Sequence, residues 1–260
     1  MHFELCTLNF FMHVYIYDSY VNQKKYDKIL ASIETRITDL GLNGKICRLG
    51  LMKNIVSLVD TELKRGAKTI VAVGNDSTVS QVINSMAGSS VPLGIIPMGK
   101  DNNLIAAGLG IGLEEEACDI LSARRITKLN LGQANNLYFL AKAAITNKGT
   151  VVEIDKNYSI EIMGPGEINI INLNINNEPL PEKIKIDPQD GILELFIKTK
   201  DSKSFFKKIT GQSVFPFKTL TILNESHPII LDNSIKVPAP AEISIAKQKL
   251  NVIVGKGRSF

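Results

Sequence analysis

The chain has no tryptophan and only three cysteines, Cys6, Cys47 and Cys118, among its 260 residues. The cysteines are widely spaced, and no CxxC or Cys/His cluster occurs, so a structural zinc site or a disulfide framework is not indicated. The three histidines are also far apart in the sequence. We therefore expect a cytoplasmic protein whose thiols stay reduced.

The sequence also lacks a long apolar run and a strong charge of either sign. Its longest stretch nearly free of charge, residues 69–99, is broken by Asp76 and is rich in Gly, Asn, Ser and Pro, which do not make a spanning helix. The apolar N-terminus carries Glu4 and no basic region, so we interpret it as leading into a buried strand rather than as a signal peptide. The net charge of +4 is too small to indicate nucleic-acid binding, and the basic residues of the chain are too scattered.

Apolar strands alternate with helical patterns in the first half of the chain. The strands are expected at 13–17, 45–49, 69–73 and 93–97, and the helices at 26–40, 55–63, 79–86, 102–109 and 114–123. Such alternation predicts an α/β domain, with a parallel sheet covered by helices on both faces.

After about residue 127 the pattern changes to short β-branched segments separated by Gly, Pro, Asn and Asp. They are expected at 137–145, 150–155, 158–163, 167–175, 192–200, 219–223, 228–231, 241–246 and 250–254. This pattern predicts a β-rich, antiparallel, sandwich-like domain with one helix near 202–209. We therefore predict two domains, 1–127 and 128–260, with a ligand cleft at their junction.

One loop of the first domain, in VAVGNDSTVSQVINSMAG (71–88), leads from a strand into a helix. Gly74 and Asn75 tolerate a sharp turn, and the helix that follows would direct its N-terminus at a phosphate. The carboxylate of Asp76 would repel a bare phosphate unless Mg²⁺, a proton or a basic neighbour were present. On these residues alone, an ordinary turn with a helix cap is the alternative.

A second loop, in PLGIIPMGKDNNLIAAGLGI (92–111), repeats the arrangement of strand, glycine turn and helix. Two such loops at the carboxyl ends of parallel strands define a crevice. Together with 126–145, 186–197 and 228–254, they resemble the diacylglycerol kinase catalytic domain family, which includes bacterial lipid kinases and sphingosine kinases and has NAD kinases as distant relatives. The family's first loop reads Gly-Gly-Asp-Gly-Thr, and its second reads Pro-Leu-Gly-Thr-Gly-Asn-Asp.

The resemblance implies an α/β nucleotide domain, a β-rich lipid-side domain and an active site between them. It implies Mg²⁺-dependent transfer of the ATP γ-phosphate to a lipid hydroxyl, such as that of diacylglycerol. Asp76 and Asp232 match the catalytic positions, and Asp190 lies in the segment that can hold Mg²⁺. The positions that match the ATP-binding loops are Gly74, Asn75, Ser77, Thr78, Gly99, Lys100, Asn102 and Asn103.

Several matched positions differ from the family pattern. Two loop glycines are Asn75 and Ser77, and Thr-Gly of the second loop is Lys100-Asp101. Three acidic positions are neutral, at Asn103, Asn130 and Ser234. Three hypotheses follow: an active lipid kinase, a catalytically impaired relative that binds nucleotide, lipid or a protein partner, and a different small-molecule kinase related to NAD kinases.

The segment SKSFFKKITGQSVFPFK (202–218) mixes lysine with phenylalanine. It fits either a peripheral contact with an anionic membrane or an amphipathic helix and strand that pack their phenylalanines inward. The expected partners are therefore a lipid alcohol and a membrane surface, without nucleic acid, and the oligomeric state is left open between a monomer and a homodimer.

Overall fold

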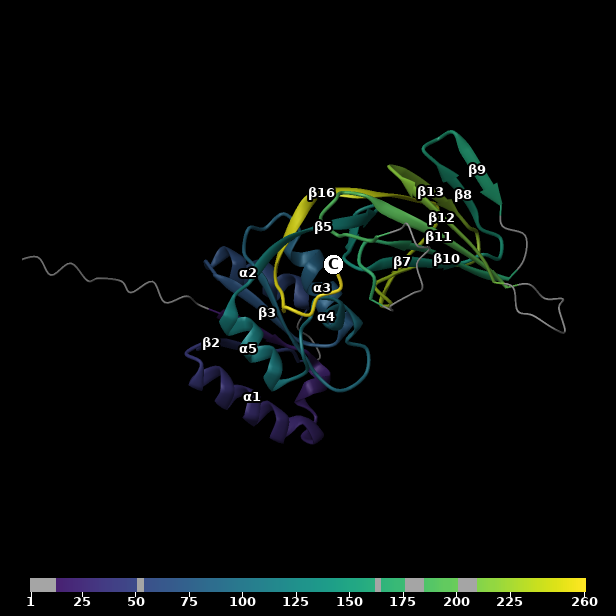
Figure 1. The fold of residues 1–260 in the computed structure, drawn as a ribbon. Helices are drawn as coiled ribbons and strands as arrows, with labels where there is room; N and C mark the ends of the chain where they lie inside the picture. The colour runs from purple at the N-terminus through teal and green to yellow at the C-terminus, as the bar shows by residue number, and fades with distance from the viewer. Residues whose placement is uncertain (1–12, 51–53, 162–164, 176–184, 201–209) are drawn as a thin grey trace, which may run out of the picture.

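The computed structural model describes residues 13–50, 54–161, 165–175, 185–200 and 210–260 (Figure 1). The N-terminal segment 1–12, with Cys6, and the helix predicted at 202–209 lie outside these ranges. Cys47 and Cys118 are buried and form no disulfide within the described residues. In that part of the chain, no helix is both long enough and apolar enough to cross a membrane.

Four parallel strands form the N-terminal half of a larger sheet, in the order β2–β1–β3–β4. The inner strands are nearly continuous apolar runs because both of their faces are covered. Their bounds are β1 His13–Tyr17, β2 Gly44–Arg48, β3 Thr69–Gly74 and β4 Leu93–Pro97.

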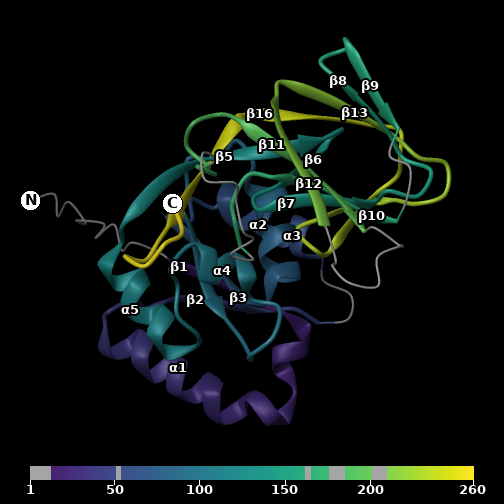
Figure 2. The same cartoon turned by 45° about the vertical axis from the view of Figure 1, so that its right-hand side comes forward.

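The helices of this half cover both faces of the sheet (Figures 1 and 2). Helix α2 packs against α3, and α1 packs against α5. In α1 the residues Leu30, Ile33 and Ile37 repeat at helical spacing and are buried. The bounds are α1 Asp27–Asp39, α2 Ile55–Lys64, α3 Asp76–Met86, α4 Leu104–Gly108 and α5 Glu115–Ala123.

The second half is built from antiparallel strands. Six of them form a separate sheet in the order β12–β11–β10–β7–β14–β15, which packs against strands of the first sheet around a second apolar core. The predicted fold class, an α/β part followed by a β-rich antiparallel part, is therefore confirmed. The strands of this six-stranded sheet are β7 Lys142–Thr146, β10 Gly166–Ile171, β11 Leu193–Lys200, β12 Thr210–Phe217, β14 Ile229–Leu231 and β15 Ile235–Val237.

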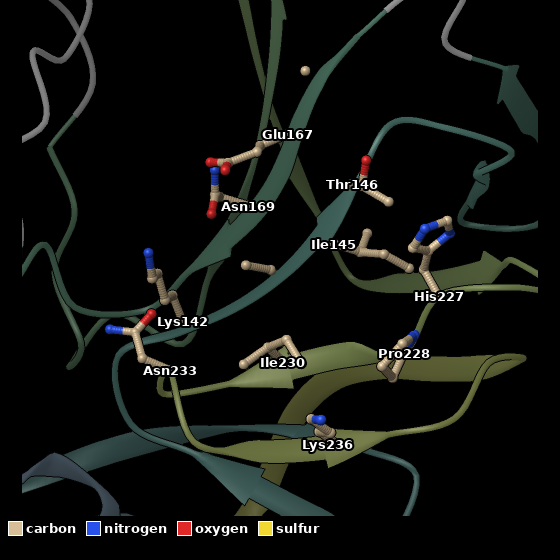
Figure 3. Close-up of a pocket in the computed structure, with 12 residues that line it drawn as sticks. Lys142, Ile145, Thr146, Glu167, Asn169, His227, Pro228, Ile230, Asn233 and Lys236 are labelled. Carbon is tan, nitrogen blue, oxygen red and sulfur yellow. The ribbon is translucent and has the colours of Figure 1, made fainter.

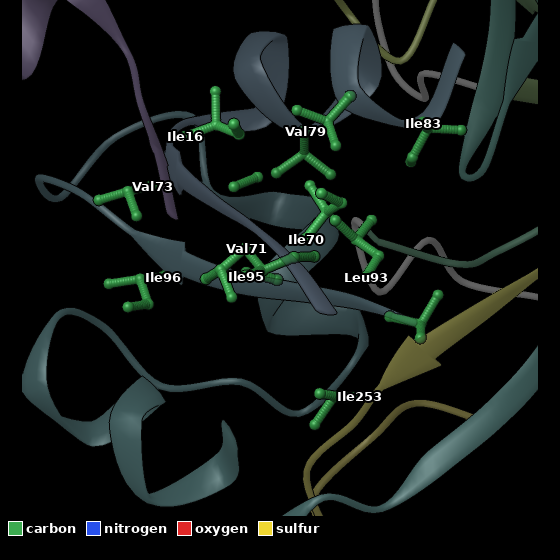
Figure 4. Packing of buried hydrophobic residues seen from close by; sticks show 14 of the residues in the cluster. Ile16, Ile70, Val71, Val73, Val79, Ile83, Leu93, Ile95, Ile96 and Ile253 are labelled. Carbon is green, nitrogen blue, oxygen red and sulfur yellow. The ribbon is translucent and has the colours of Figure 1, made fainter. Parts of the chain in front are cut away.

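The first sheet continues into the second half through its longest strand, β16 (Ala241–Ile253). β16 pairs parallel with β4, where Val252 lies opposite Leu93, and antiparallel with β5 and β13. The end of β16 packs in the N-terminal core, as Ile253 shows in Figure 4. The remaining strands are β5 Ile126–Ala134, β6 Leu137–Phe139, β8 Val151–Ile154, β9 Tyr158–Glu161 and β13 Thr219–Leu223.

The structure differs from the predicted elements in two places that bear on the site. The apolar segment 137–145 is two strands, β6 and β7, because the backbone leaves the ladder at Leu140 and Ala141. The segments 241–246 and 250–254 belong to one strand, β16, with an irregularity in its pairing with β5 between Ile245 and Lys249. The division predicted at residue 127 stays a prediction, although the sheet itself runs across it.

Candidate functional site

Helix α3 begins with a closed set of hydrogen bonds. Asn75 is the N-cap, and its Oδ1 accepts from the backbone N–H of Ser77 (3.0 Å) and Thr78 (3.3 Å). The Thr78 hydroxyl accepts in return from the N–H of Asn75 (3.2 Å), which completes a capping box. The N–H of Asp76 donates to the carbonyl of Asn102 (2.7 Å). The N–H groups from residues 75 to 78, which a phosphate would use, therefore all have partners within the protein.

The side chain of Thr78 explains the glycine that precedes the helix. Thr78 is fully buried, and its hydroxyl donates to Oδ2 of Asp18 (2.6 Å), which directly follows β1. A Cβ at Gly74 would collide with the hydroxyl oxygen and the Cβ of Thr78. Gly74 is therefore needed for the close approach of Thr78, and not for an unusual φ.

The second loop is attached to the first by backbone bonds. The N–H of Met98 in the second loop donates to the carbonyl of Gly74 in the first (3.0 Å). Within the second loop, the side-chain amide of Asn103 donates to the carbonyl of Gly99 (2.7 Å). Gly99 and Asn102 adopt φ values of +82° and +60°, the left-handed region that glycine and asparagine tolerate best. The Lys100 side chain is exposed to solvent.

Asp76 joins the two loops through its carboxylate. It is 4% exposed, Oδ2 accepts from the N–H of Leu104 (2.9 Å), and Oδ1 accepts from the N–H of Ile105 (3.0 Å). It therefore caps α4, for which the N-cap residue Asn103 supplies no side-chain bond. Burial raises the pKa of Asp76 to about 6; the two N–H donors oppose this shift, and the charge of Asp232 adds to it.

Asp232 lies in the tight turn between β14 and β15 and has no exposed surface. Its Oδ2 accepts from the N–H of Leu140 (2.9 Å), and its Oδ1 accepts from those of Ala141 (2.8 Å) and Lys142 (3.0 Å). These three donors lie where the chain passes from β6 to β7. The carboxylate of Asp232 therefore accepts hydrogen bonds from backbone N–H groups at the point where the chain leaves the β-ladder. Burial raises the pKa of Asp232, against the effect of these hydrogen bonds.

The fold brings Asp76 and Asp232 together from the two halves of the chain. Ser80 lies one turn after Asp76 on α3, and its hydroxyl contacts Oδ2 of Asp232 (3.4 Å). The charge of Asp232 is one of the causes of the raised pKa of Asp76. The two predicted catalytic carboxylates thus interact at the junction between the α/β part and the antiparallel part.

Asp190 is not part of this group. Its Oδ1 accepts from the N–H of Ile192 (2.8 Å) in an exposed turn. The described residues contain no cluster of three or more His, Cys, Asp or Glu side chains that could hold a metal. Asp76 and Asp232 use both of their carboxylate oxygens as acceptors for backbone N–H groups, and neither belongs to such a cluster. Asp190 as a metal ligand stays a prediction.

Among the neutral replacements, Asn130 and the hydroxyl oxygen of the half-buried Ser234 are shielded from solvent. Asn130 is buried, its carbonyl accepts from the side chain of Asn172 (3.0 Å), and its own Nδ2 has no partner among the described residues. The Ser234 hydroxyl likewise finds none there.

Sequence reasoning missed Asp18 and Ser80, although both hold predicted site residues. Asp18 had a detectable signal, because it directly follows β1, the strand beside β3 in the sheet. Ser80 had none, because its partner Asp232 belongs to a distant turn.

Comparison with known proteins gives the family. Residues 13–134, which contain both loops, match the model of the diacylglycerol kinase catalytic domain. Residues 13–134 belong to this family. Its members are diacylglycerol kinase-like lipid kinases, and the family is the one that the two loops resemble.

Individual relatives agree with this assignment over shorter segments. A diacylglycerol kinase of Staphylococcus haemolyticus is 37% identical over 87 residues, which are 32% of this chain and 26% of that protein. A diacylglycerol kinase of Staphylococcus epidermidis (strain ATCC 35984) is 28% identical over 131 residues, 48% of this chain and 40% of that protein. The matches therefore span less than half of these relatives' own lengths.

Solved structures with a diacylglycerol kinase-like fold resemble this chain over nearly its whole length. The crystal structure of a diacylglycerol kinase from Bacillus anthracis str. Sterne superposes with a TM-score of 0.73, covering 95% of this chain and 98% of that one, at 17% identity. A second structure from the same organism gives a TM-score of 0.75 at 14% identity. At such identities the likeness establishes the fold, including the antiparallel half that the family model does not cover.

Proposed function

We propose that this protein is an ATP-dependent lipid kinase that transfers the γ-phosphate of ATP to the hydroxyl of a lipid such as diacylglycerol. The observation that carries the proposal is that Asp76 and Asp232, one from each half of the chain, lie near each other at the junction: the charge of Asp232 adds to the raised pKa of Asp76, and Ser80, one turn after Asp76, contacts Asp232. The family of residues 13–134 supports it, since the match includes both loops.

In this proposal Asp232 is the base. Its carboxylate takes the proton of the lipid hydroxyl, the hydroxyl oxygen bonds to the γ-phosphorus, and the bond to the bridging β–γ oxygen breaks to release ADP. Burial raises the pKa of Asp232, which makes its carboxylate a stronger proton acceptor. Because Asp232 is fully buried, the turn at 232–233 must shift for the hydroxyl to reach it.

Asp76 is a positioning residue in the same proposal, because it holds the second loop and α4 against α3. Gly74, Asn75, Ser77, Thr78, Gly99, Lys100, Asn102 and Asn103 would surround the nucleotide. Magnesium would arrive with the nucleotide phosphates and neutralise their charge, since Mg²⁺ in kinase sites is held largely by substrate phosphates and water.

The test is transfer of labelled γ-phosphate from Mg-ATP to a panel of lipid alcohols in mixed micelles. We expect transfer by the wild-type chain and a loss of about a hundredfold or more in Asp232→Asn, because general base catalysis contributes this much. Asp60→Asn, in an exposed ion pair on α2, is the matched control and keeps the wild-type rate. Failure of the folded wild-type chain to phosphorylate any lipid of the panel would contradict the proposal.

A second candidate function, a catalytically impaired relative that binds nucleotide, lipid or a protein partner, is favoured by the closed start of α3. Every N–H from residue 75 to residue 78 has a protein partner, so a phosphate would have to displace the Asn75 side chain. Asn75→Gly removes that side chain and restores a glycine of the family pattern, and Ser77→Gly restores the other.

Thermal-shift titrations with ATP, ADP and NAD, with and without Mg²⁺, separate the candidates. If Asn75 blocks the loop, Asn75→Gly with Ser77→Gly binds ATP more tightly than the wild-type chain, and the wild-type chain transfers no phosphate. Equal ATP affinity in both proteins would contradict the block. A response to NAD with NAD phosphorylation would favour a small-molecule kinase instead.

The peripheral membrane contact is part of the first proposal. Of the Lys- and Phe-rich segment, the described part includes Phe215, which is exposed, and the exposed Lys218. Co-sedimentation with anionic vesicles tests this contact, and light scattering of the purified chain tests the homodimer.

A further inference from the structure

The outer face of the six-stranded sheet carries a pocket of about 590 Å³ (Figure 3). The kinase proposal uses none of the side chains in it; Lys142 supplies only its backbone N–H to Asp232. The polar side chains that line the pocket are Lys142, Thr146, Glu167, Asn169, His227, Asn233 and Lys236.

Strand register places these residues on one face. Lys236 lies opposite Ile230, Ile230 opposite Ala144, and Ala144 opposite Asn169, across β15, β14, β7 and β10. Directly opposed residues share a face of a sheet. Neighbouring strands lie about 4.8 Å apart, so the row from Lys236 to Asn169 is about 14 Å long, enough for a small polar head group. The short side chain of Ala144 leaves room in the middle of the row.

Asn169 is the residue that points to a ligand. It is 1% exposed, and neither its Oδ1 nor its Nδ2 has a hydrogen-bond partner in the described part of the chain. Leaving a buried polar group unpaired costs about 1–3 kcal/mol, so such groups normally have a partner. Asn169 lines the pocket, and an occupant can supply both missing bonds.

The charges of the pocket define the occupant's chemistry. Lys142 and Lys236 line it, and neither has an ion-pair partner among the described residues. They therefore favour an anion, and His227 on the opposite side of the pocket adds a further donor (Figure 3). Glu167 lies beside Asn169 in the same view; it disfavours a second anionic group and accepts hydrogen bonds from hydroxyl groups.

We propose that this pocket binds a phosphate ester that carries neighbouring hydroxyl groups, with the phosphate between Lys142 and Lys236 and the hydroxyls at Glu167 and Asn169. This chemistry is shared by a free polyol phosphate and by the head group of a polyol phospholipid. Binding here requires no phosphoryl transfer, so the proposal stands independently of the kinase activity.

Calorimetric titration of the full chain with glycerol 3-phosphate, inorganic phosphate and glycerol tests the free form of the ligand. Co-sedimentation with phosphatidylcholine vesicles, with and without phosphatidylglycerol, tests the lipid form. We expect glycerol 3-phosphate, or the vesicles that contain phosphatidylglycerol, to bind. Lys142→Gln with Lys236→Gln should weaken this binding about tenfold or more, because each lysine offers a charge-assisted bond to the phosphate.

Two further variants make the test specific. Lys247→Gln removes an exposed lysine of β16 outside the pocket and should leave binding unchanged. Asn169→Leu keeps the approximate side-chain volume but removes both hydrogen-bonding atoms, and it should abolish binding in a chain that still unfolds cooperatively. Absence of binding by both forms overturns the proposal, as does an equal loss in Lys247→Gln. Inorganic phosphate that binds as tightly as glycerol 3-phosphate overturns the role of the hydroxyls.

Discussion

Two polar regions of this protein differ in whether their buried polar groups have hydrogen-bond partners. At the junction, both oxygens of Asp76 and of Asp232 accept backbone N–H groups. In the outer-face pocket, the buried amide of Asn169 has no partner in the described residues. The first arrangement stabilises the fold by joining separate loops, whereas the second costs stability unless something binds. The variants below should therefore have opposite signs in the two regions.

The largest effect is expected for Asp232→Ala. The change leaves the N–H groups of Leu140, Ala141 and Lys142 buried without their acceptor. We expect the free energy of unfolding to fall by about 3 kcal/mol or more, since each such group costs about 1–3 kcal/mol. Denaturant unfolding measures this. Asp190→Ala, which removes an acceptor in an exposed turn, is the control and should cost less than about 1 kcal/mol. Equal losses in the two variants would show that burial of Asp232 does not matter.

The next effect is on the pH dependence of stability. Burial raises the pKa of Asp76 from 3.8 to about 6, so the folded state holds a proton that the unfolded chain has already released. The free energy of unfolding should therefore fall as pH rises from about 4 to about 6, by roughly 3 kcal/mol at most. In Asp76→Asn, which cannot titrate, this part of the slope should disappear.

Glu194 provides the comparison for that measurement. Burial, with the charge of Asp190, raises the pKa of Glu194 to about 7. Glu194→Gln should therefore remove a fall in stability that extends from about pH 4.5 to 7, beyond the range of Asp76. Unfolding curves at several pH values distinguish the two. An unchanged profile in Asp76→Asn would mean that the pKa of Asp76 does not differ between the folded and unfolded states.

A smaller loss is expected for Thr78→Val, which keeps the side-chain shape but removes the hydroxyl. The variant loses the bond to Asp18 and the acceptor for the N–H of Asn75. We expect a cost of about 2 kcal/mol in the free energy of unfolding, because the half-buried carboxylate of Asp18 loses a donor and the N–H of Asn75 loses its acceptor. Thr61→Val, on the exposed side of α2, loses only a bond to the carbonyl of Ser57 and should change stability little.

The smallest effect has the opposite sign. Without ligand, Asn169→Leu should raise the melting temperature by a few degrees, corresponding to about 1 kcal/mol, because an unpaired buried amide is replaced by an apolar group. Differential scanning calorimetry measures the change. A lower melting temperature would mean that Asn169 has a protein partner and that the two regions do not differ.

The predicted bounds agree best with the structure for elements whose formation depends little on residues far along the chain. The strands at 13–17, 93–97 and 219–223 have the predicted bounds, because each is a short run of β-forming residues that ends at a turn-forming segment. The division of 137–145 at Leu140 and Ala141 was not predictable, because the acceptor of both N–H groups is Asp232, far along the chain. β16 appeared as two strands because the irregularity near Ile245 interrupts its apolar pattern.

Sequence patterns alone were enough to predict the class of fold, the family of residues 13–134 and the two loops that end β3 and β4. These depend on short-range periodicity and on motifs whose residues are close in the chain. The roles of the key side chains became visible only in the three-dimensional structure. Asn75 closes the start of α3, Asp76 and Asp232 hold backbone from other elements, and Asn169 lies unpaired in a pocket. The reason is physical: whether a buried polar atom is satisfied depends on which distant backbone groups the fold brings within hydrogen-bonding distance.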